Sequence, residues 1–186
     1  MELSDRELMA RLVGGDREAL APLMERHYRR LHRVALGYLR DADEALDCVQ
    51  ETFVKAYQNA SRWEASSEVG AWLTRIAIND AIDRYRRTKR RVATQEPLGD
   101  SDHDVRIVSE DPSPERAVLS RQISERVGRA LNGLPATQRA VFVLRHYEER
   151  TLPEIAGILG ISLGTVKSSL HRALHRLRER LAGLEA

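Results

Sequence analysis

The segment from Thr151 to Leu170 constrains the fold of this chain more than any other stretch. It reads TLPEIAGILGISLGTVKSSL, with apolar residues at helical spacing on both sides of a turn that contains Gly160. Such a pattern predicts two short helices joined by a tight turn. Thr151 and Glu154 stand three residues apart, which predicts a capping box at the start of the first helix. Together these features are typical of a helix-turn-helix that binds DNA.

The second helix of this segment has two dissimilar faces. On a helical wheel, one face gathers the apolar residues Val166, Leu170, Ala173, Leu174, Leu177 and Leu181. Such a face is expected to pack against the preceding helices. The other side carries polar and basic groups that can donate hydrogen bonds to base edges and phosphates. An ordinary amphipathic helix with a solvated basic face is the alternative interpretation. The candidate DNA-binding residues are Lys167, Ser168, His171, Arg172, His175 and Arg176.

The composition favours helices throughout. Aromatic residues make up only 5% of the 186 residues, and there are 11 Gly and 6 Pro, too few turn residues for a strand-rich sandwich. Leu, Ala, Arg and Glu are abundant, and all four are good helix formers. We therefore predict an all-α fold of two helical bundles.

Several classes of function are disfavoured by what the sequence lacks. The single Cys48 rules out an internal disulfide and a cysteine zinc site, and we expect it to be a small buried hydrophobe. His171 and His175 are four residues apart but have no third ligand nearby, so no metal or cofactor is expected. No catalytic constellation is present, which argues against an enzyme. No apolar run approaches the ~18–20 residues of a membrane span, so we expect a soluble, cytoplasmic protein.

Charge and turn residues divide the chain into three parts. Residues 96–115 hold four Pro or Gly residues with seven acidic and one basic side chain, whereas residues 116–186 hold twelve basic and six acidic ones. An acidic, Pro-containing stretch cannot bury a core and predicts a flexible tether. We predict domains at residues 1–95 and 116–186, joined by a linker over 96–115.

Local signals place the helices within these domains. Ser4 and Glu7 predict a capping box before the first helix, and Pro22 predicts a kink or restart in the second. The predicted helices run from after Ser4 to Gly14, from Asp16 to Leu39, and over 42–60, 68–91, 114–132, 135–147, 151–160 and 164–182.

The outer face of the predicted helix over 42–60 is a candidate docking patch. Its core stripe is predicted to be Ala45, Leu46, Val49, Phe53, Ala56 and Tyr57. The opposite face is acidic and polar with one apolar residue, a combination that suits a basic helical partner. A solvated face is the alternative. The candidate contact residues are Asp47, Gln50, Glu51 and Val54.

The predicted helix over 68–91 and the loop before it form a second candidate DNA surface. The helix carries Trp, Asn and Arg on one stripe and continues into a basic run that ends at Arg91. Asn and Arg can pair with base edges, and an aromatic ring can stack on an unstacked base, so single-stranded or locally melted DNA fits better than duplex. Core packing is the alternative role for both tryptophans. The candidate residues are Trp63, Trp72, Arg75, Asn79, Asp83, Arg86 and Arg87.

Three motifs in order resemble one family. They are DEALDCVQETFVKAY at 43–57, AWLTRIAIN at 71–79, and the helix-turn-helix that ends in GTVKS at 164–168. The chain resembles the extracytoplasmic-function (ECF) sigma factors, the small two-domain group of the sigma-70 family of bacterial RNA polymerase. The resemblance covers nearly the whole chain outside the linker.

The resemblance implies a dissociable promoter-specificity subunit of RNA polymerase. The first domain would bind the clamp helices of the largest catalytic subunit through Asp47, Gln50 and Glu51, and would recognise and melt the −10 element through the helix over 68–91. The second domain would read the −35 element and rest on the polymerase flap. Members of the group are typically controlled by an anti-sigma factor, often membrane-bound. Ser169 stands where the family usually has Arg, which implies one lost DNA contact.

Two other classes of function remain open on the sequence. One is a free-standing helix-turn-helix regulator that binds a palindrome as a dimer, without polymerase. The other is a helical adaptor that binds an acidic partner and no DNA. Transcription that depends on the chain and on core polymerase separates the three.

Overall fold

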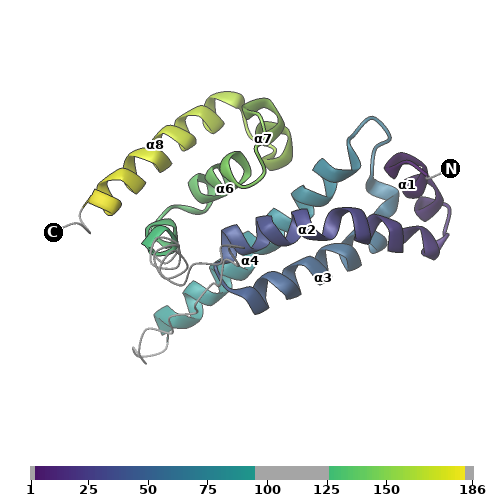
Figure 1. The fold of residues 1–186 in the computed structure, drawn as a ribbon, viewed down its shortest axis with the longest axis horizontal. Coiled ribbons are helices and arrows are strands. Elements are labelled where there is room, and N and C mark those ends of the chain that lie inside the picture. Colours follow the sequence, from purple (N-terminus) through teal and green to yellow (C-terminus); the bar gives the residue numbers. More distant parts are fainter. Residues whose placement is uncertain (1–2, 95–125, 183–186) are drawn as a thin grey trace, which may run out of the picture.

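The computed structural model describes residues 3–94 and 126–182, and every regular element in these ranges is a helix (Figure 1). The prediction of an all-α fold is confirmed. The predicted linker over 96–115 lies outside the described residues. Within those residues, no helix is both long and apolar enough to cross a membrane.

The chain opens with capped helices, as the local signals predict. Helix α1 (Asp5–Val13) begins at Ser4, whose hydroxyl accepts from the Glu7 N–H while the Glu7 carboxylate accepts from the Ser4 N–H. A 3-10 turn η1 (Arg17–Ala19), capped by Asp16, then leads into α2 (Leu20–Leu39). The predicted restart near Pro22 is therefore this 3-10 turn, and Pro22 lies in the first turn of α2, where a missing N–H does no harm.

Helices α2, α3 (Ala42–Gln58) and α4 (Val69–Thr94) pack against one another as the first body (Figure 1). A 3-10 turn η2 (Ala60–Arg62) and a loop connect α3 to α4. Leu31, Val49 and Leu73, one from each of the three helices, are almost completely buried at the centre of this body. The apolar periodicity of the three segments is thus the source of the bundle.

The second body contains a helical stretch at 126–132 and the helices α6 (Ala136–His146), α7 (Leu152–Leu159) and α8 (Leu163–Ala182). The predicted start of its first helix near residue 114 lies outside the described residues. Leu131 and Leu134 pack with Ala173 and Leu177 in a small cluster of their own.

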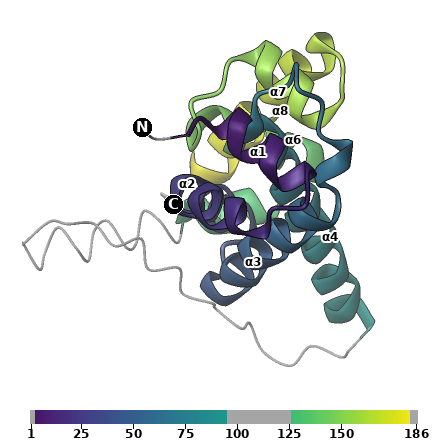
Figure 2. The ribbon, with the colours of Figure 1, turned by 90° about the vertical axis from the view of Figure 1, so that its right-hand side faces the viewer.

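The two bodies are in contact. Val141 and Leu144 of α6 and Ile155 of α7 belong to the same apolar core as the buried residues of α1 to α4. Figure 2 shows α6, α7 and α8 lying along one side of the first body. The sequence predicted two bodies on a tether but gave no signal that they would share a core.

Candidate nucleic-acid and protein interfaces

Capping interactions fix the geometry of the helix-turn-helix. The Thr151 N–H donates to Oε2 of Glu154 at 2.8 Å, and the Glu154 N–H donates to the Thr151 hydroxyl at 3.4 Å, which confirms the predicted capping box. Hydrogen bonds from the Thr151 side chain and backbone lower the pKa of Glu154 to about 2. Helix α7 then ends at Gly160 in the left-handed region, with φ of +65°. The Ser162 hydroxyl accepts from the Thr165 N–H at 3.1 Å, at the start of α8.

Helix α8 presents the predicted basic face to solvent. Five of its six candidate residues are exposed: Lys167, His171, Arg172, His175 and Arg176. The sixth, Ser168, is half-buried, and its hydroxyl donates to the Thr165 carbonyl oxygen at 3.1 Å. His175 Nδ1 lies 3.3 Å from a carboxylate oxygen of Glu179 on the same face.

Ser169 does not lie on this face. Its side chain is buried, with 7% exposure, together with Val166, Ala173 and Leu177. The expected loss of a DNA contact at position 169 does not fit this placement, because the side chain points into the second body. The predicted core residues Leu170, Leu174 and Leu181 are only half-buried.

Helix α4 exposes most of its candidate stripe. Arg75, Asn79, Asp83, Arg86 and Arg87 are all exposed. The structure thus brings Asn and Arg side chains together along one exposed run. Within it, a terminal nitrogen of Arg86 lies 4.0 Å from an Asp83 carboxylate oxygen.

The two tryptophans are less exposed than the residues of this stripe. Trp63 is 8% exposed and belongs to the apolar core, and its indole nitrogen has no hydrogen-bond partner in the described structure. In this arrangement the ring of Trp63 is not accessible to a base, which favours the alternative role in core packing. Trp72 is half-buried and packs against the same core.

The outer face of α3 has the predicted polar residues and one more apolar residue than expected. Asp47 and Gln50 are exposed, Glu51 is half-buried, and Val54 is 47% exposed. Leu46, predicted as core, is 39% exposed instead. Leu46, Gln50 and Val54 follow one another at four-residue spacing, so the face is a stripe with apolar ends and a polar centre. Leu46 precedes Val54 by two steps of four residues, and this spacing could have predicted that Leu46 lies on the same outer face.

A buried carboxylate links helix α4, which carries the candidate stripe, to helix α3. Asp80 of α4 has 3% side-chain exposure and accepts hydrogen bonds from Lys55 of α3 and, at 2.5 Å, from Arg84. Burial alone would raise the pKa of Asp80, but these two cations outweigh burial and hold the pKa below its ordinary value. Arg84 also bonds Glu44 of α3 at 3.1 Å. The network fixes the position of α4 relative to α3.

Cys48 has the buried position that was predicted. Its thiol donates to the Ala77 carbonyl oxygen at 3.5 Å, and burial, together with the nearby Asp80 carboxylate, raises the pKa of Cys48 to about 12. A thiol in this environment is a poor nucleophile at neutral pH. In the described ranges, no three His, Cys, Asp or Glu residues form a group that could hold a metal ion.

These features define a helical DNA-binding protein with two bodies, one of which carries a helix-turn-helix. Comparison with known families agrees with both parts. Residues 23–91 match Sigma-70 region 2, and residues 124–177 match Sigma-70 region 4.

Individual relatives align over the whole length. The ECF RNA polymerase sigma factor SigW of Bacillus subtilis is 33% identical, over 99% of this chain and 100% of its own length. The ECF sigma factor SigM of Mycobacterium tuberculosis is 36% identical, over 98% of this chain and 87% of its own. The chain belongs to the ECF sigma factors of the sigma-70 family.

Solved structures give the same result for the fold. The structure of CnrH in complex with the cytosolic domain of CnrY matches with a TM-score of 0.68 and 27% identity, over 96% of this chain and 97% of that one. The sigma factor RpoE of Bartonella quintana, in complex with the anti-sigma factor NepR, matches with a TM-score of 0.65 and 27% identity. The match covers 87% of this chain and 96% of that one.

Proposed function

We propose that this ECF sigma factor binds core RNA polymerase through the outer face of α3 and directs it to promoters through α4 and α8. The observation that carries the proposal is the exposed basic face of α8, behind a capped α7, in a chain whose two halves match sigma regions 2 and 4. In this proposal α8 enters the major groove of the −35 element. Among the exposed candidates, Lys167, His171 and Arg172 lie nearest the start of the helix and would reach bases or phosphates.

Helix α4 would hold the −10 element as single strand. Arg75, Asn79 and Arg86 are free of the core and offer both hydrogen-bond donors and positive charge. Trp72, which is half-buried, would stack on a base. Trp63 is not included, because it lies in the core.

The outer face of α3 would bind the clamp helices of the largest polymerase subunit, with Leu46 and Val54 as apolar contacts around Asp47, Gln50 and Glu51. The second body would contact the flap of the other large subunit. Residues 1–95 and 116–186 would act as the two domains, and residues 96–115 as the linker between them. The protein would work in the cytoplasm, as a non-enzymatic factor.

Control by an anti-sigma factor is part of the proposal. Two related structures, of CnrH and of RpoE, contain a bound partner, which for RpoE is an anti-sigma factor. A partner of this kind would hold the present chain away from polymerase.

Transcription from a promoter library tests the proposal. Core polymerase with this chain is expected to produce transcripts from a small subset of random templates, and core polymerase alone is not. Tight binding to a palindromic duplex without polymerase would instead support a free-standing regulator. Equal transcription with and without the chain would rule out a sigma factor.

A further inference from the structure

The first turn of α8 carries an exposed apolar side chain. Leu163, the first residue of the helix, is 39% exposed. Four other large apolar residues in the described ranges are exposed to a similar degree, and all of them lie on α1, α2 or α3: Val13, Met24, Leu46 and Val54. Among the described residues of the second body, Leu163 is therefore the one large apolar side chain with this exposure.

Residues on either side of Leu163 attach the start of α8 to the core. Ile161, in the turn, is half-buried and packs against the large apolar cluster, and Val166 is completely buried within that cluster. Leu163 lies between them in the sequence and keeps much of its surface in water. Because the anchoring contacts come from its neighbours, truncation of Leu163 is expected to leave α8 in place.

The first turn of α8 is held in a fixed conformation and is open to approach from outside. The hydroxyl groups of Ser162 and Thr165 lie 2.8 Å apart, and the Thr165 N–H donates to the Ser162 hydroxyl at 3.1 Å. Gly164, next to Leu163, is exposed, and a Cβ atom added there would have only the Ser162 hydroxyl oxygen within 4 Å, at 3.8 Å. No bulky side chain therefore stands at this position, and the leucine is presented from a rigid support.

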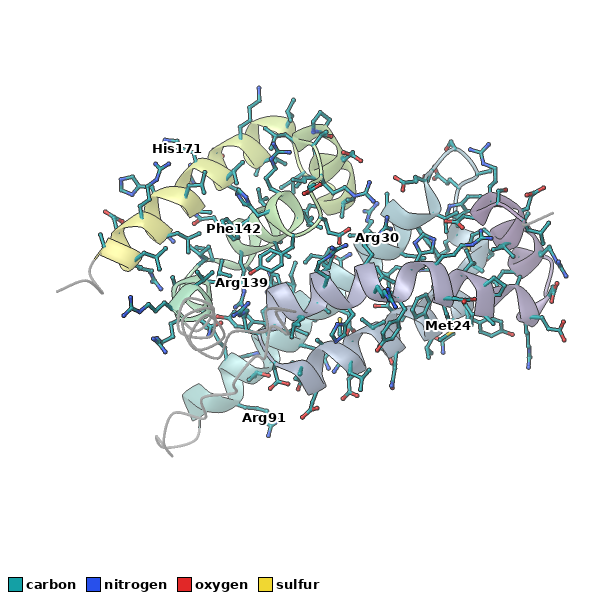
Figure 3. All side chains as sticks on the ribbon, viewed as in Figure 1. Met24, Arg30, Arg91, Arg139, Phe142 and His171 are labelled. Carbon is teal, nitrogen blue, oxygen red and sulfur yellow. The ribbon has the colours of Figure 1, made fainter. Side chains whose placement is uncertain are left out.

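Leu163 adjoins the basic face of α8. Lys167 follows it by four residues and His171 by eight, and both are exposed. Side chains four residues apart on a helix are neighbours, so the three residues form a row along the helix. Figure 3 shows His171 on the side of α8 that faces away from the first body. Leu163 thus extends the candidate DNA face by one turn, with an apolar group in place of a charged one.

The major groove contains one apolar group that a leucine can contact, the C5-methyl group of thymine. Recognition helices contact base edges with the residues near their N-terminus, which is where Leu163 lies. We propose that Leu163 contacts a thymine methyl group in the −35 element and selects thymine at that position. This inference rests on the proposed function, because it assumes that α8 enters the major groove of promoter DNA.

Helix geometry limits where this thymine can lie. An α-helix rises about 1.5 Å per residue, so Leu163 and Lys167 are separated by about 6 Å along the axis of α8. Base pairs in duplex DNA are about 3.4 Å apart. The selected thymine is therefore expected within about two base pairs of the position that depends on Lys167. Comparing Lys167→Ala with Leu163→Ala on promoters substituted at each −35 position locates both.

Replacing thymine with deoxyuridine tests the contact, because the two bases differ only in the methyl group and keep the same hydrogen-bonding edge. The probe is a promoter recovered from the random library, with each thymine of the −35 element replaced in turn on either strand. Core polymerase with the wild-type chain is expected to bind one of these substituted promoters about fourfold more weakly, the loss expected for one methyl-sized group left in water. Binding is measured by competition with the unmodified promoter.

Variants of the chain assign the methyl effect to Leu163. Leu163→Ala is expected to bind the thymine and deoxyuridine promoters equally well, whereas Leu163→Met, which keeps an apolar side chain of similar length, is expected to retain most of the difference. The matched control is Leu174→Ala, which removes the same atoms from a half-buried position further along α8. L174A should retain the full fourfold ratio. Because each ratio compares two DNAs with one variant, a change in protein stability cancels.

The outcomes separate this contact from the proposed function. If no deoxyuridine substitution weakens binding of the wild type, or if L163A retains the difference, Leu163 does not read thymine. If L163A weakens binding to core polymerase and leaves the thymine ratio unchanged, the leucine contacts protein and the proposal is refuted. Failure of the proposed function has a different result: core polymerase with the wild-type chain would then show no preference among promoter sequences at all.

Discussion

Charged side chains at the surface of this molecule either face solvent alone or lie with polar neighbours on one helix face. Glu51 and Arg172 are of the second kind. Glu51 lies beside Asp47 and Gln50 on α3, and its carboxylate is 3.7 Å from the Lys55 ammonium. Arg172 lies beside His171 on α8. Each permits a prediction at the scale of one side chain.

Glu51→Lys is expected to weaken binding to core polymerase by roughly tenfold or more, because it places a cation on a face that we propose meets a basic partner. Binding is measured by fluorescence anisotropy of labelled chain titrated with core polymerase. Glu25→Lys makes the same charge change at an exposed site on α2 and serves as the control. Equal affinity of the two variants for core polymerase would contradict a docking role for α3.

Arg172→Ala is expected to lower affinity for the −35 duplex by about 1–3 kcal/mol at one base pair, since a bidentate contact to guanine discriminates by that amount. The measurement is binding of the polymerase holoenzyme to promoters substituted at each −35 position. Arg6→Ala removes an exposed charge on α1 and should change nothing. A uniform loss over all sequences would instead identify a phosphate contact.

Single residues also show where sequence reasoning works and where it fails. The exposed candidates of α8 and α4 follow directly from helical periodicity. The position of the apolar face of each helix determines which residues lie on the opposite, exposed face. Trp63 lies in a loop, where no periodicity distinguishes a buried ring from an exposed one. Leu46 and Ser169 lie at the borders of apolar stripes, where packing with a neighbouring helix decides exposure.

At the scale of elements, paired helices are held by buried polar groups as well as by apolar faces. Asp80 of α4 pairs with Lys55 of α3, and its helix neighbour Arg84 pairs with Glu44 of α3. The pKa of Asp80 lies below its ordinary value of 3.8, so its ionised form is favoured in the folded state. Its contribution to stability is therefore full above that pH and is lost as the pH falls through the lowered pKa.

Asp80→Asn is expected to destabilise the protein by about 2–3 kcal/mol at pH 7, because two cations lose a charged acceptor. The measurement is urea unfolding at pH 7 and at pH 3. The difference between the wild type and D80N should shrink at the lower pH. Asp83→Asn, at an exposed site one turn away, is the control, and an equal effect of both variants would contradict the role of Asp80.

Helix boundaries are predictable where a cap marks them. Ser4 and Thr151 begin helices through capping boxes, as their sequences indicate. The restart at Pro22 is also marked, but its form, a 3-10 turn capped by Asp16, is set by how α1 packs onto α2. The Asp80 network could not be predicted, since it joins residues 25 positions apart and periodicity gives no register between helices.

At the scale of the whole molecule, the contact between the bodies was not predictable. Helical periodicity shows that α6 and α7 have apolar faces, but it does not say which other face each will meet. The mid-helix Gly37 was one local sign of a close approach, here by the Tyr147 ring, and a single glycine has many explanations.

Glu148 makes this contact dependent on pH. Burial raises the pKa of Glu148, and the charges of Arg30, Arg33 and Arg150 only partly oppose the shift. A carboxyl pKa that is raised while the bodies are in contact means that the contact is favoured at low pH and is weakened as the pH rises through that pKa. Hydrogen exchange of the α6 amides, corrected for intrinsic rates, should therefore show greater protection at pH 5 than at pH 7.5.

Glu148→Gln is expected to remove this pH dependence. Glu149→Gln is the neighbouring control, because Glu149 is exposed and should not matter. Protection that changes equally with pH in E148Q and in the wild type would assign the effect to another group.

The core shared by both bodies has a thermal consequence. Separating the bodies hydrates apolar side chains of α6 and α7, and hydration of such groups raises the heat capacity. The free energy of separation must therefore pass through a maximum as temperature changes, so that warming and strong cooling both release the second body. The contact between the bodies would therefore be strongest at an intermediate temperature.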